Sequence, residues 1–335
     1  MLLWQVPYNG VMTSVVKNTA IVIVTYKRLE LLQVLFESIQ ANTLWPKRIY
    51  VIDNDASEDV GALVANLGKQ LQGSVVQWVA MPTNTGGAGG FSKGVELAYQ
   101  DGAEWIWVMD DDVKLLPDAL EKLLPWMQTA EEENHLAIQG RRLNYDGSDF
   151  YWQYRFIEKL GIPNPVAPSR FKEGETFRRM NTVCFEGGLF HRKVVEQIGI
   201  PDYRFFIYWD DTIFGYLASQ VTQPILIRDL LLQRTRQIAN IKLGKVRKLN
   251  STSNMVRYYI MRNRGFMARY MRLYGDYSPI LWSIGTMATF GKEFIRLFIT
   301  KDFKEGLPAL RRGMRDARVI IRDPAWQPMK ELRTG

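Results

Sequence analysis

Short apolar runs separated by helical patterns are the feature that most limits how this chain can fold. Three such runs cover residues 20–25, 48–53 and 105–109, and their bulky or β-branched side chains suit strands buried on both faces. The segments 29–42 and 60–71 carry apolar residues at helical spacing. Strands that alternate with helices predict an α/β fold with a largely parallel sheet.

Polar residues stand where these predicted strands end. Asp53 closes the second run, a glycine-rich segment covers residues 84–90, and three consecutive aspartates follow the third run at 110–112. Ligands of open parallel sheets bind at the carboxyl ends of strands, so these residues are expected to meet in one crevice. Adjacent carboxylates repel each other unless a cation lies among them, which favours a Mg²⁺ or Mn²⁺ site. The alternative is a solvated acidic turn before the next helix.

Charge is distributed unevenly along the 335 residues. From residue 228 onward 23 Lys and Arg stand against 8 Asp and Glu, whereas the preceding part holds 20 basic and 27 acidic residues. A basic tail on a mildly acidic domain predicts an anionic partner such as a membrane surface or a phosphorylated lipid. No nucleic acid is expected, because no recognition motif accompanies the charge. The alternative is a helical bundle packed on the catalytic domain with a solvated basic rim.

Cysteine content and hydropathy bear on the cellular location. The single cysteine, Cys184, excludes an internal disulfide framework and fits a reducing compartment, where it is expected to be a packed thiol. The amino terminus lacks the basic start and apolar core of a signal peptide. The uncharged stretch 278–291 is too short to span a membrane. We therefore expect a cytoplasmic protein, peripheral at the inner face of the cytoplasmic membrane.

Four motifs, in order along the chain, resemble those of glycosyltransferase family 2. They occupy residues 24–28, 51–57, 84–91 and 109–112. Members of this family have the GT-A fold, a Rossmann-like, mostly parallel sheet flanked by helices, and they use nucleotide sugars. The resemblance implies a GT-A domain over residues 18–235, preceded by an arm (1–17) and followed by a basic helical region (236–335).

The resemblance also implies roles for single residues. The implied donor-binding residues are Thr25, Tyr26, Arg28, Asp53, Asp55, Asn84, Gly86, Gly87, Asp110 and Asp111. Asp110 and Asp112 match the acidic triplet that binds Mn²⁺ or Mg²⁺, a metal that would offset the charge of the departing diphosphate. The glycine-rich segment is expected to be a turn that opens a helix and lets backbone approach the sugar or diphosphate closely.

A further block at residues 205–215 resembles the acceptor side of the family, and its Trp-Asp-Asp is especially like bacterial galactofuranosyl- and rhamnosyltransferases. Inversion at the anomeric carbon needs a carboxylate opposite the leaving diphosphate, and the resemblance makes Asp211 that catalytic base. The implied acceptor-binding residues are Trp209, Asp210, Gly187 and Gly188. The alternative for Asp210 is the N-cap of the following helix.

One departure from the family pattern concerns the metal. Relatives often supply a histidine some twenty residues after the acidic pair, but residues 225–236 contain none. Gln233 or a neighbour could stand there, and Arg234 or Arg236 could supply part of the charge stabilisation. The two histidines of the chain precede the pair and are expected to be surface or structural residues.

The remaining segments carry weaker signals. Residues 141–179 break the strand and helix pattern, and we expect acceptor-side loops there, with Tyr151, Trp152 and Tyr154 among aromatic faces for sugar rings. A plain surface excursion is the alternative. Helices are expected over 251–274, 281–298 and 301–322, the first with Arg257, Arg262, Arg264, Arg269 and Arg272 on one side.

Together these features predict an inverting glycosyltransferase that moves galactofuranose from UDP-galactofuranose to a glycan or lipid-linked acceptor during the synthesis of bacterial cell-surface polysaccharide. A rhamnosyltransferase that uses dTDP-rhamnose is the nearest alternative. A catalytically inactive scaffold that keeps the nucleotide pocket is an alternative of another class, and so is a nucleotidyltransferase, which would release pyrophosphate. The sequence leaves open whether the protein forms a homo-oligomer.

Overall fold

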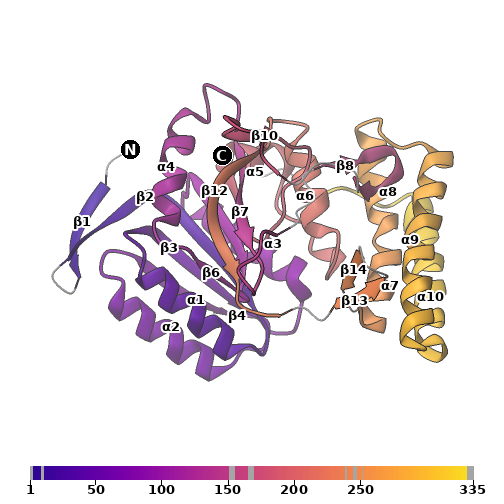
Figure 1. Ribbon diagram of the computed structural model, residues 1–335, viewed down its shortest axis with the longest axis horizontal. Helices are drawn as coiled ribbons and strands as arrows, with labels where there is room; N and C mark the ends of the chain where they lie inside the picture. Colours follow the sequence, from indigo (N-terminus) through magenta and orange to yellow (C-terminus); the bar gives the residue numbers. More distant parts are fainter. Residues whose placement is uncertain are drawn as a thin grey trace.

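A computed structural model describes residues 3–8, 11–150, 155–164, 170–237, 240–243, 247–250 and 252–329. Figure 1 shows a central sheet with its covering helices on one side of the view and the carboxyl-terminal helices on the other. Tyr151, Trp152 and Tyr154, predicted to offer aromatic faces to sugar rings, lie outside the described residues.

The central sheet has ten strands, eight of which follow the order β10-β12-β7-β11-β5-β2-β3-β4. Their bounds are β2 Val11–Thr25, β3 Leu44–Asp53, β4 Val75–Ala80, β5 Trp105–Asp110, β7 Ala137–Leu143, β10 Phe177–Arg179, β11 Gly188–His191 and β12 Ile225–Arg234. β1 (Leu3–Tyr8) pairs with β2, and β6 (Val113–Leu115) pairs with β12. Strands β5, β2, β3 and β4 are parallel, as predicted, whereas β11 runs antiparallel to both β5 and β7.

Six helices accompany the sheet: α1 Leu29–Gln40, α2 Glu58–Gln70, α3 Gly86–Gln100, α4 Ala119–Thr129, α5 Arg192–Ile198 and α6 Asp210–Ala218. The prediction that the glycine-rich segment forms a turn before its helix is wrong, because α3 already begins at Gly86. The reason is close packing. A Cβ atom at Gly90 or Gly94 would come within 2.5 Å of Val24 or 2.2 Å of Val22 on β2, so glycine lets the helix lie directly on the strand.

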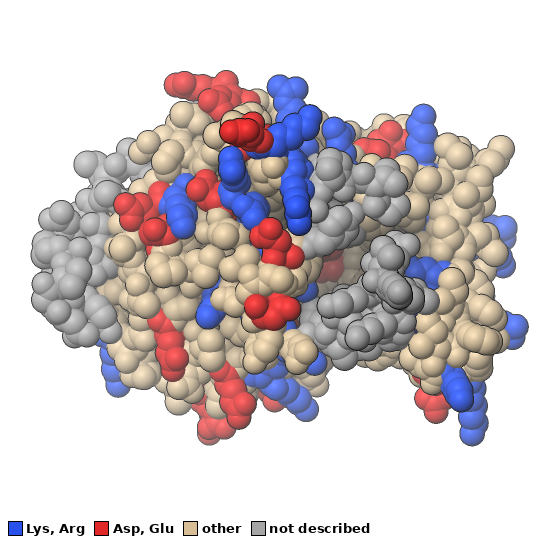
Figure 2. Space-filling model, viewed as in Figure 1, with Lys and Arg blue, Asp and Glu red and all other residues tan. Residues whose placement is uncertain are grey.

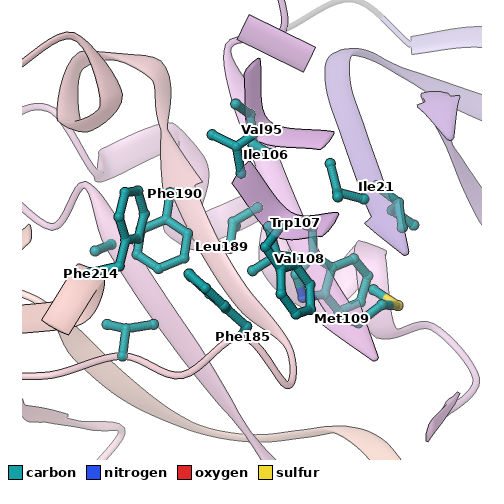
Figure 3. Packing of buried hydrophobic residues seen from close by; sticks show 14 of the residues in the cluster. Ile21, Val95, Ile106, Trp107, Val108, Met109, Phe185, Leu189, Phe190 and Phe214 are labelled. Atoms are coloured by element: carbon teal, nitrogen blue, oxygen red, sulfur yellow. The ribbon is translucent and has the colours of Figure 1, made fainter. Parts of the chain in front are cut away.

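The core is centred on β5, whose first five residues are buried. Figure 3 shows Leu189 and Phe190 of β11 beside this strand, with Phe185 and Phe214 next to them. The rings of Phe190 and Phe214 are 5.0 Å apart, and those of Phe185 and Phe214 are 5.6 Å apart. Because Phe214 belongs to α6, this aromatic cluster anchors the helix that begins with Asp210 and Asp211.

The carboxyl-terminal region contains α7 Asn254–Arg262, α8 Arg264–Leu273, α9 Pro279–Thr300 and α10 Phe303–Arg322, preceded by the hairpin β13 Asn240–Leu243 and β14 Arg247–Asn250. The single helix predicted over 251–274 is divided at Asn263. Two of its arginines are also not on a solvated side. Arg257 is buried and pairs with Asp302 at 2.9 Å, and buried Arg264 donates to the carbonyl oxygens of 160 and 161.

Short elements join the two parts. The 3₁₀ turn η1 (Glu158–Leu160), between the short strands β8 (Phe156–Ile157) and β9 (Ile162–Pro163), lies against α9, and the turn η2 (Tyr203–Phe205) lies against α3. Within the part of the chain that the structure describes, every helix is too short or too polar to cross a membrane.

Candidate active site

The sheet register brings the predicted donor residues to one edge. Thr25 at the end of β2 is the cross-strand partner of Asp53 at the end of β3, and Val24 is the partner of Asp110 at the end of β5. The prediction that these strand ends meet in one place is therefore confirmed.

The three aspartates at the end of β5 have different surroundings. Asp111 is buried and accepts hydrogen bonds from Thr25 Oγ1 at 2.7 Å and from Arg28 at 2.9 Å. Asp112 is partly exposed and pairs with the same guanidinium at 3.3 Å. Burial, followed by the charges of Asp112 and Glu186, raises the pKa of Asp110 well above its usual range. A raised pKa means that the charged form of Asp110 is unfavourable. A divalent cation bound nearby would stabilise that charged form. The surroundings of Asp110 and Asp112 are thus compatible with the metal site that the sequence predicts, and their role as its ligands stays a prediction.

A cavity of about 730 Å³ lies beside the triplet and has the size of a small-molecule site. Tyr26, Arg28, Asp55 and Arg236 line it. Asp53 is fully buried, and its carboxylate accepts from the backbone N–H groups of 55 and 57 and from Trp78 Nε1. Asp55 therefore lies at the cavity, whereas Asp53 orders the loop to which Asp55 belongs.

The start of α3 also faces this region. Asn84 Oδ1 accepts from the N–H of Gly86 at 2.9 Å. Asn54, which the sequence analysis did not single out, accepts from the N–H of residue 85 and donates to the carbonyl oxygen of Gly86. Gly86 has φ +70°, and a Cβ atom there would come within 2.0 Å of Phe206 O. Gly86 therefore allows the donor-side helix to touch the loop before Asp210, and the space beside Gly87 is open.

A largely buried ion cluster next to the triplet was not predicted from the sequence. Glu186 accepts two hydrogen bonds of 2.6 Å from Arg234 and pairs with Arg142 at 3.3 Å. Burial opposes the charge of Glu186, but the two arginines outweigh burial and lower its pKa. Arg234 also favours the charged form of Asp112, as do Arg28 and Arg236. The only available signal was that Glu186 directly precedes the glycine pair.

Three predicted acceptor residues have evident packing roles. Gly187 has φ +93°, and a Cβ atom there would lie 2.4 Å from Leu232. A Cβ atom at Gly188 would lie 2.4 Å from the carbonyl oxygen of Cys184. Trp209 is buried and its indole N–H donates to the carbonyl oxygen of Ile260 at 3.2 Å. Their contact with an acceptor stays a prediction.

The loop before α6 is strained. Phe206, Tyr208 and Trp209 all have positive φ, between 64° and 76°, a region that side chains other than glycine rarely adopt. Asn263 Nδ2 lies 2.8 to 3.0 Å from the carbonyl oxygens of residues 205, 207 and 208 and donates to this group. Trp209, not Asp210, is the N-cap residue of α6, and Asp210 is the first residue of the helix.

The adjacent carboxylates Asp210 and Asp211 both have pKa values above the usual range of aspartate. Burial and then the charge of Asp211 raise the pKa of Asp210 to about 8. Burial also raises the pKa of Asp211, although hydrogen bonds from the N–H and Oγ1 of Thr212 favour its charged form. The hydrogen bonds from the N–H and Oγ1 of Thr212 also orient the Asp211 carboxylate, which is compatible with its predicted role as a base.

The other residues considered for metal or thiol chemistry are buried in the described part of the chain. Cys184 is buried, and burial raises its pKa to about 12, as expected of a packed thiol. Both histidines are buried, His135 beside Phe177 and His191 beside Trp105. His191 lies near Glu104 and Glu131, at the amino end of β5, opposite the aspartate triplet.

The comparisons with known proteins agree with this arrangement. The family model described as glycosyl transferase family 2 matches residues 20–199. Galactofuranosyltransferase GlfT1 of Mycolicibacterium smegmatis is 29% identical over 263 residues, which cover 73% of this chain and 81% of the relative. GlfT1 of Mycobacterium tuberculosis is 29% identical over 205 residues, 57% of this chain and 60% of the relative.

Solved structures show the same fold. S. aureus TarS 1–349 superposes with a TM-score of 0.55 at 12% identity, covering 91% of this chain and 81% of that one. The complex of TarS 1–349 with UDP-GlcNAc gives a TM-score of 0.51 at 11% identity, covering 90% and 91%. At this identity the likeness establishes the architecture, a GT-A fold, and nothing about the sugar.

Proposed function

This chain belongs to glycosyl transferase family 2, and from that premise we propose that it is an inverting, metal-assisted galactofuranosyltransferase that uses UDP-galactofuranose and a glycan or lipid-linked acceptor. The observation that carries the proposal is that one ion cluster, Glu186 with Arg142 and Arg234, interacts with both the aspartate triplet 110–112 and the aspartate pair 210–211. Glu186 lies close enough to Asp110 and Asp112 to raise their pKa, and Arg142, its partner, favours the charged form of Asp211. The sugar itself is inferred from the similarity to GlfT1.

Each group has a task in the proposed reaction. The nucleotide occupies the cavity lined by Tyr26 and Asp55, with its diphosphate toward the triplet. A Mn²⁺ or Mg²⁺ ion held by Asp110 and Asp112 would supply Lewis-acid stabilisation of the leaving diphosphate. Arg28 adds fixed positive charge there. Asp211 accepts the proton of the acceptor hydroxyl as that oxygen attacks the anomeric carbon from the opposite face.

Nucleotide binding tests the donor. We expect UDP with Mn²⁺ to raise the melting temperature, because a ligand at 100 times its Kd adds about 2.7 kcal/mol to the free energy of unfolding. GDP and dTDP serve as competitors, and a chelator should remove most of the shift. The Asp112→Asn variant should lose the metal-dependent part, while Asp101→Asn, at the end of α3, should behave like the wild type.

The possible outcomes separate the alternatives. A larger shift with dTDP would replace the galactofuranose donor by dTDP-rhamnose. A shift with UDP but no release of UDP in the presence of UDP-galactofuranose and candidate acceptors would favour the inactive scaffold. Absence of any nucleotide shift would overturn the proposal.

We also propose that the basic region 236–335 holds the enzyme at an anionic membrane surface. One face of α9 is exposed and apolar over a helix about 33 Å long. Ile280 and Phe298 are 75% and 71% exposed, and the face continues through Leu281, Ile284, Met287, Phe294, Ile295 and Ile299. Lys292, Lys301 and Lys304 are exposed on α9 and just beyond it. An apolar stripe with nearby lysines is typical of helices that lie in a membrane interface.

Vesicle flotation measures this contact. Replacing Ile284 and Phe298 together by glutamine should weaken binding to phosphatidylglycerol vesicles at least tenfold, since each side chain contributes roughly 1.5–3 kcal/mol when fully buried. Neutral phosphatidylcholine vesicles should bind the wild type more weakly. Val34→Gln, an equally simple change at an exposed valine of α1, is the matched control. Equal flotation of the double variant and the wild type would contradict the membrane assignment.

A further inference from the structure

A second cavity, of about 390 Å³, is lined by arginine and lies outside the donor site. Its walls come from β7, β12 and the segments around 149 and 170. Four arginines line it together with a single carboxylate: Arg141, Arg142, Arg170, Arg228 and Asp149. Figure 2 shows Lys and Arg side chains gathered over the side of the molecule where Figure 1 places β7, β10 and β12. None of these residues lines the 730 Å³ cavity beside the aspartate triplet.

The positive charge of this cavity is only partly compensated. Arg141 donates to Asp149 at 2.8 Å and to the carbonyl oxygen of residue 228 at 3.3 Å. Within the described ranges, neither Arg170 nor Arg228 forms an ion pair, so one carboxylate serves three guanidinium groups. The rim is also stiffened, because Phe171 lies under Arg141 and Arg178. A basic cavity of this kind favours an anionic ligand, and guanidinium groups match phosphate oxygens in two-point contacts.

The cavity adjoins the acceptor side of the catalytic cluster. Arg142 lines it and also donates to the carbonyl oxygen of Glu186 at 2.9 Å. Phe150 lines it as well, and its ring contacts the guanidinium groups of Arg142 and Arg234, each 4.2 Å from the ring centre. A single layer of side chains therefore separates this cavity from Glu186. In the proposed function the donor diphosphate already has Arg28 in its own cavity and the aspartate triplet beside it, so the arginine-lined cavity calls for a different anion.

We propose that the arginine-lined cavity binds a phosphate group carried by the acceptor, so that the substrate class is a phosphorylated or diphosphate-linked glycan rather than a neutral one. This inference rests on the proposed function. Arg170 and Arg228 make the direct contacts with phosphate oxygens, and Arg141 orders the wall through Asp149. Binding of the phosphate there fixes how far the acceptor hydroxyl can reach toward Asp211.

The test compares two acceptors that differ only in the phosphate. Transfer is measured with an octyl glycoside and with the matching glycosyl phosphate, and binding of the glycosyl phosphate is measured by calorimetry without donor. The Arg170→Gln, Arg228→Gln double variant should lose the preference for the phosphorylated acceptor by at least tenfold, because it removes two guanidinium groups that form charge-assisted hydrogen bonds with phosphate oxygens. Arg179→Gln, an exposed arginine on β10 that does not line the cavity, should keep the preference.

The outcomes separate this inference from the proposed function. Glycosyl phosphate that binds through Arg170 and Arg228 without any sugar transfer would support the cavity and overturn the enzyme assignment. Normal transfer with an unchanged acceptor preference in the double variant would overturn the cavity. If the double variant instead loses only its binding to phosphatidylglycerol vesicles, the phosphate comes from a lipid headgroup, and the acceptor assignment is wrong.

Discussion

Replacing Asp211 with asparagine is expected to lower sugar transfer by roughly 100- to 10,000-fold, the range that a general base contributes. Asparagine keeps the shape of the side chain and can still accept from Thr212, but it cannot take the proton of the attacking hydroxyl. The variant should still be stabilised by UDP and Mn²⁺, because Asp211 lies outside the donor cavity. Release of UDP from the sugar donor, followed by chromatography, gives the rate.

The dependence of the transfer rate on pH tests independently whether Asp211 is the base. A base acts only when it is deprotonated, and burial raises the pKa of Asp211. Transfer by the wild type should therefore fall as the pH is lowered through this raised pKa, at a higher pH than an exposed aspartate would give. Asp210→Asn is the control, since it removes the neighbouring titration near pH 8 and keeps the base. Transfer by Asp211→Asn at a rate close to that of the wild type would show that another group is the base.

The sheet was largely predictable because its strands are buried on both faces and therefore read as continuous apolar runs. The predicted runs 48–53 and 105–109 lie within β3 (Leu44–Asp53) and β5 (Trp105–Asp110). The long β2, in contrast, was underestimated, since the residues before Ala20 lack a clear period. An apolar run predicts a strand well when burial alone determines its bounds. It fails when pairing with another strand extends the strand beyond the run.

The residues of the candidate site also fall into a predictable and an unpredictable group. Strand ends such as Thr25 and Asp110 could be placed together because topology alone aligns the carboxyl ends of parallel strands. The arginines that neutralise Glu186 come from β7 and β12, 44 and 48 residues away in sequence. No periodicity links such positions, so a buried ion cluster of this kind emerges only from the tertiary structure. The same holds for Asn263. The sequence pattern predicts only that it lies within a helix and gives no sign of its contacts with the loop before Asp210.

The carboxyl-terminal helices take part in shaping the catalytic loop, and Asn263 is the residue through which they do so. Its fully buried amide donates to a group of three carbonyl oxygens in the loop that precedes Asp210, and Arg262 donates to two carbonyl groups of the same loop. Three residues of that loop have unfavourable positive φ. A strained backbone persists only where its surroundings over-determine it, so these bonds hold Asp211 in place.

Asn263→Ala should therefore lower kcat by about 100-fold, the effect of a displacement near 1 Å in a catalytic group, with little change in UDP binding. It should also lower the free energy of unfolding, by about 1–3 kcal/mol for each buried carbonyl left without a partner. Arg264→Gln is the matched control, because Arg264 is equally buried in the next helix but bonds the 160–161 segment, which is not the catalytic loop. Both variants are compared at temperatures where each is fully folded. If Arg264→Gln lowers kcat as much as Asn263→Ala, the helices act on catalysis only through general stability, and the positioning role of Asn263 is wrong.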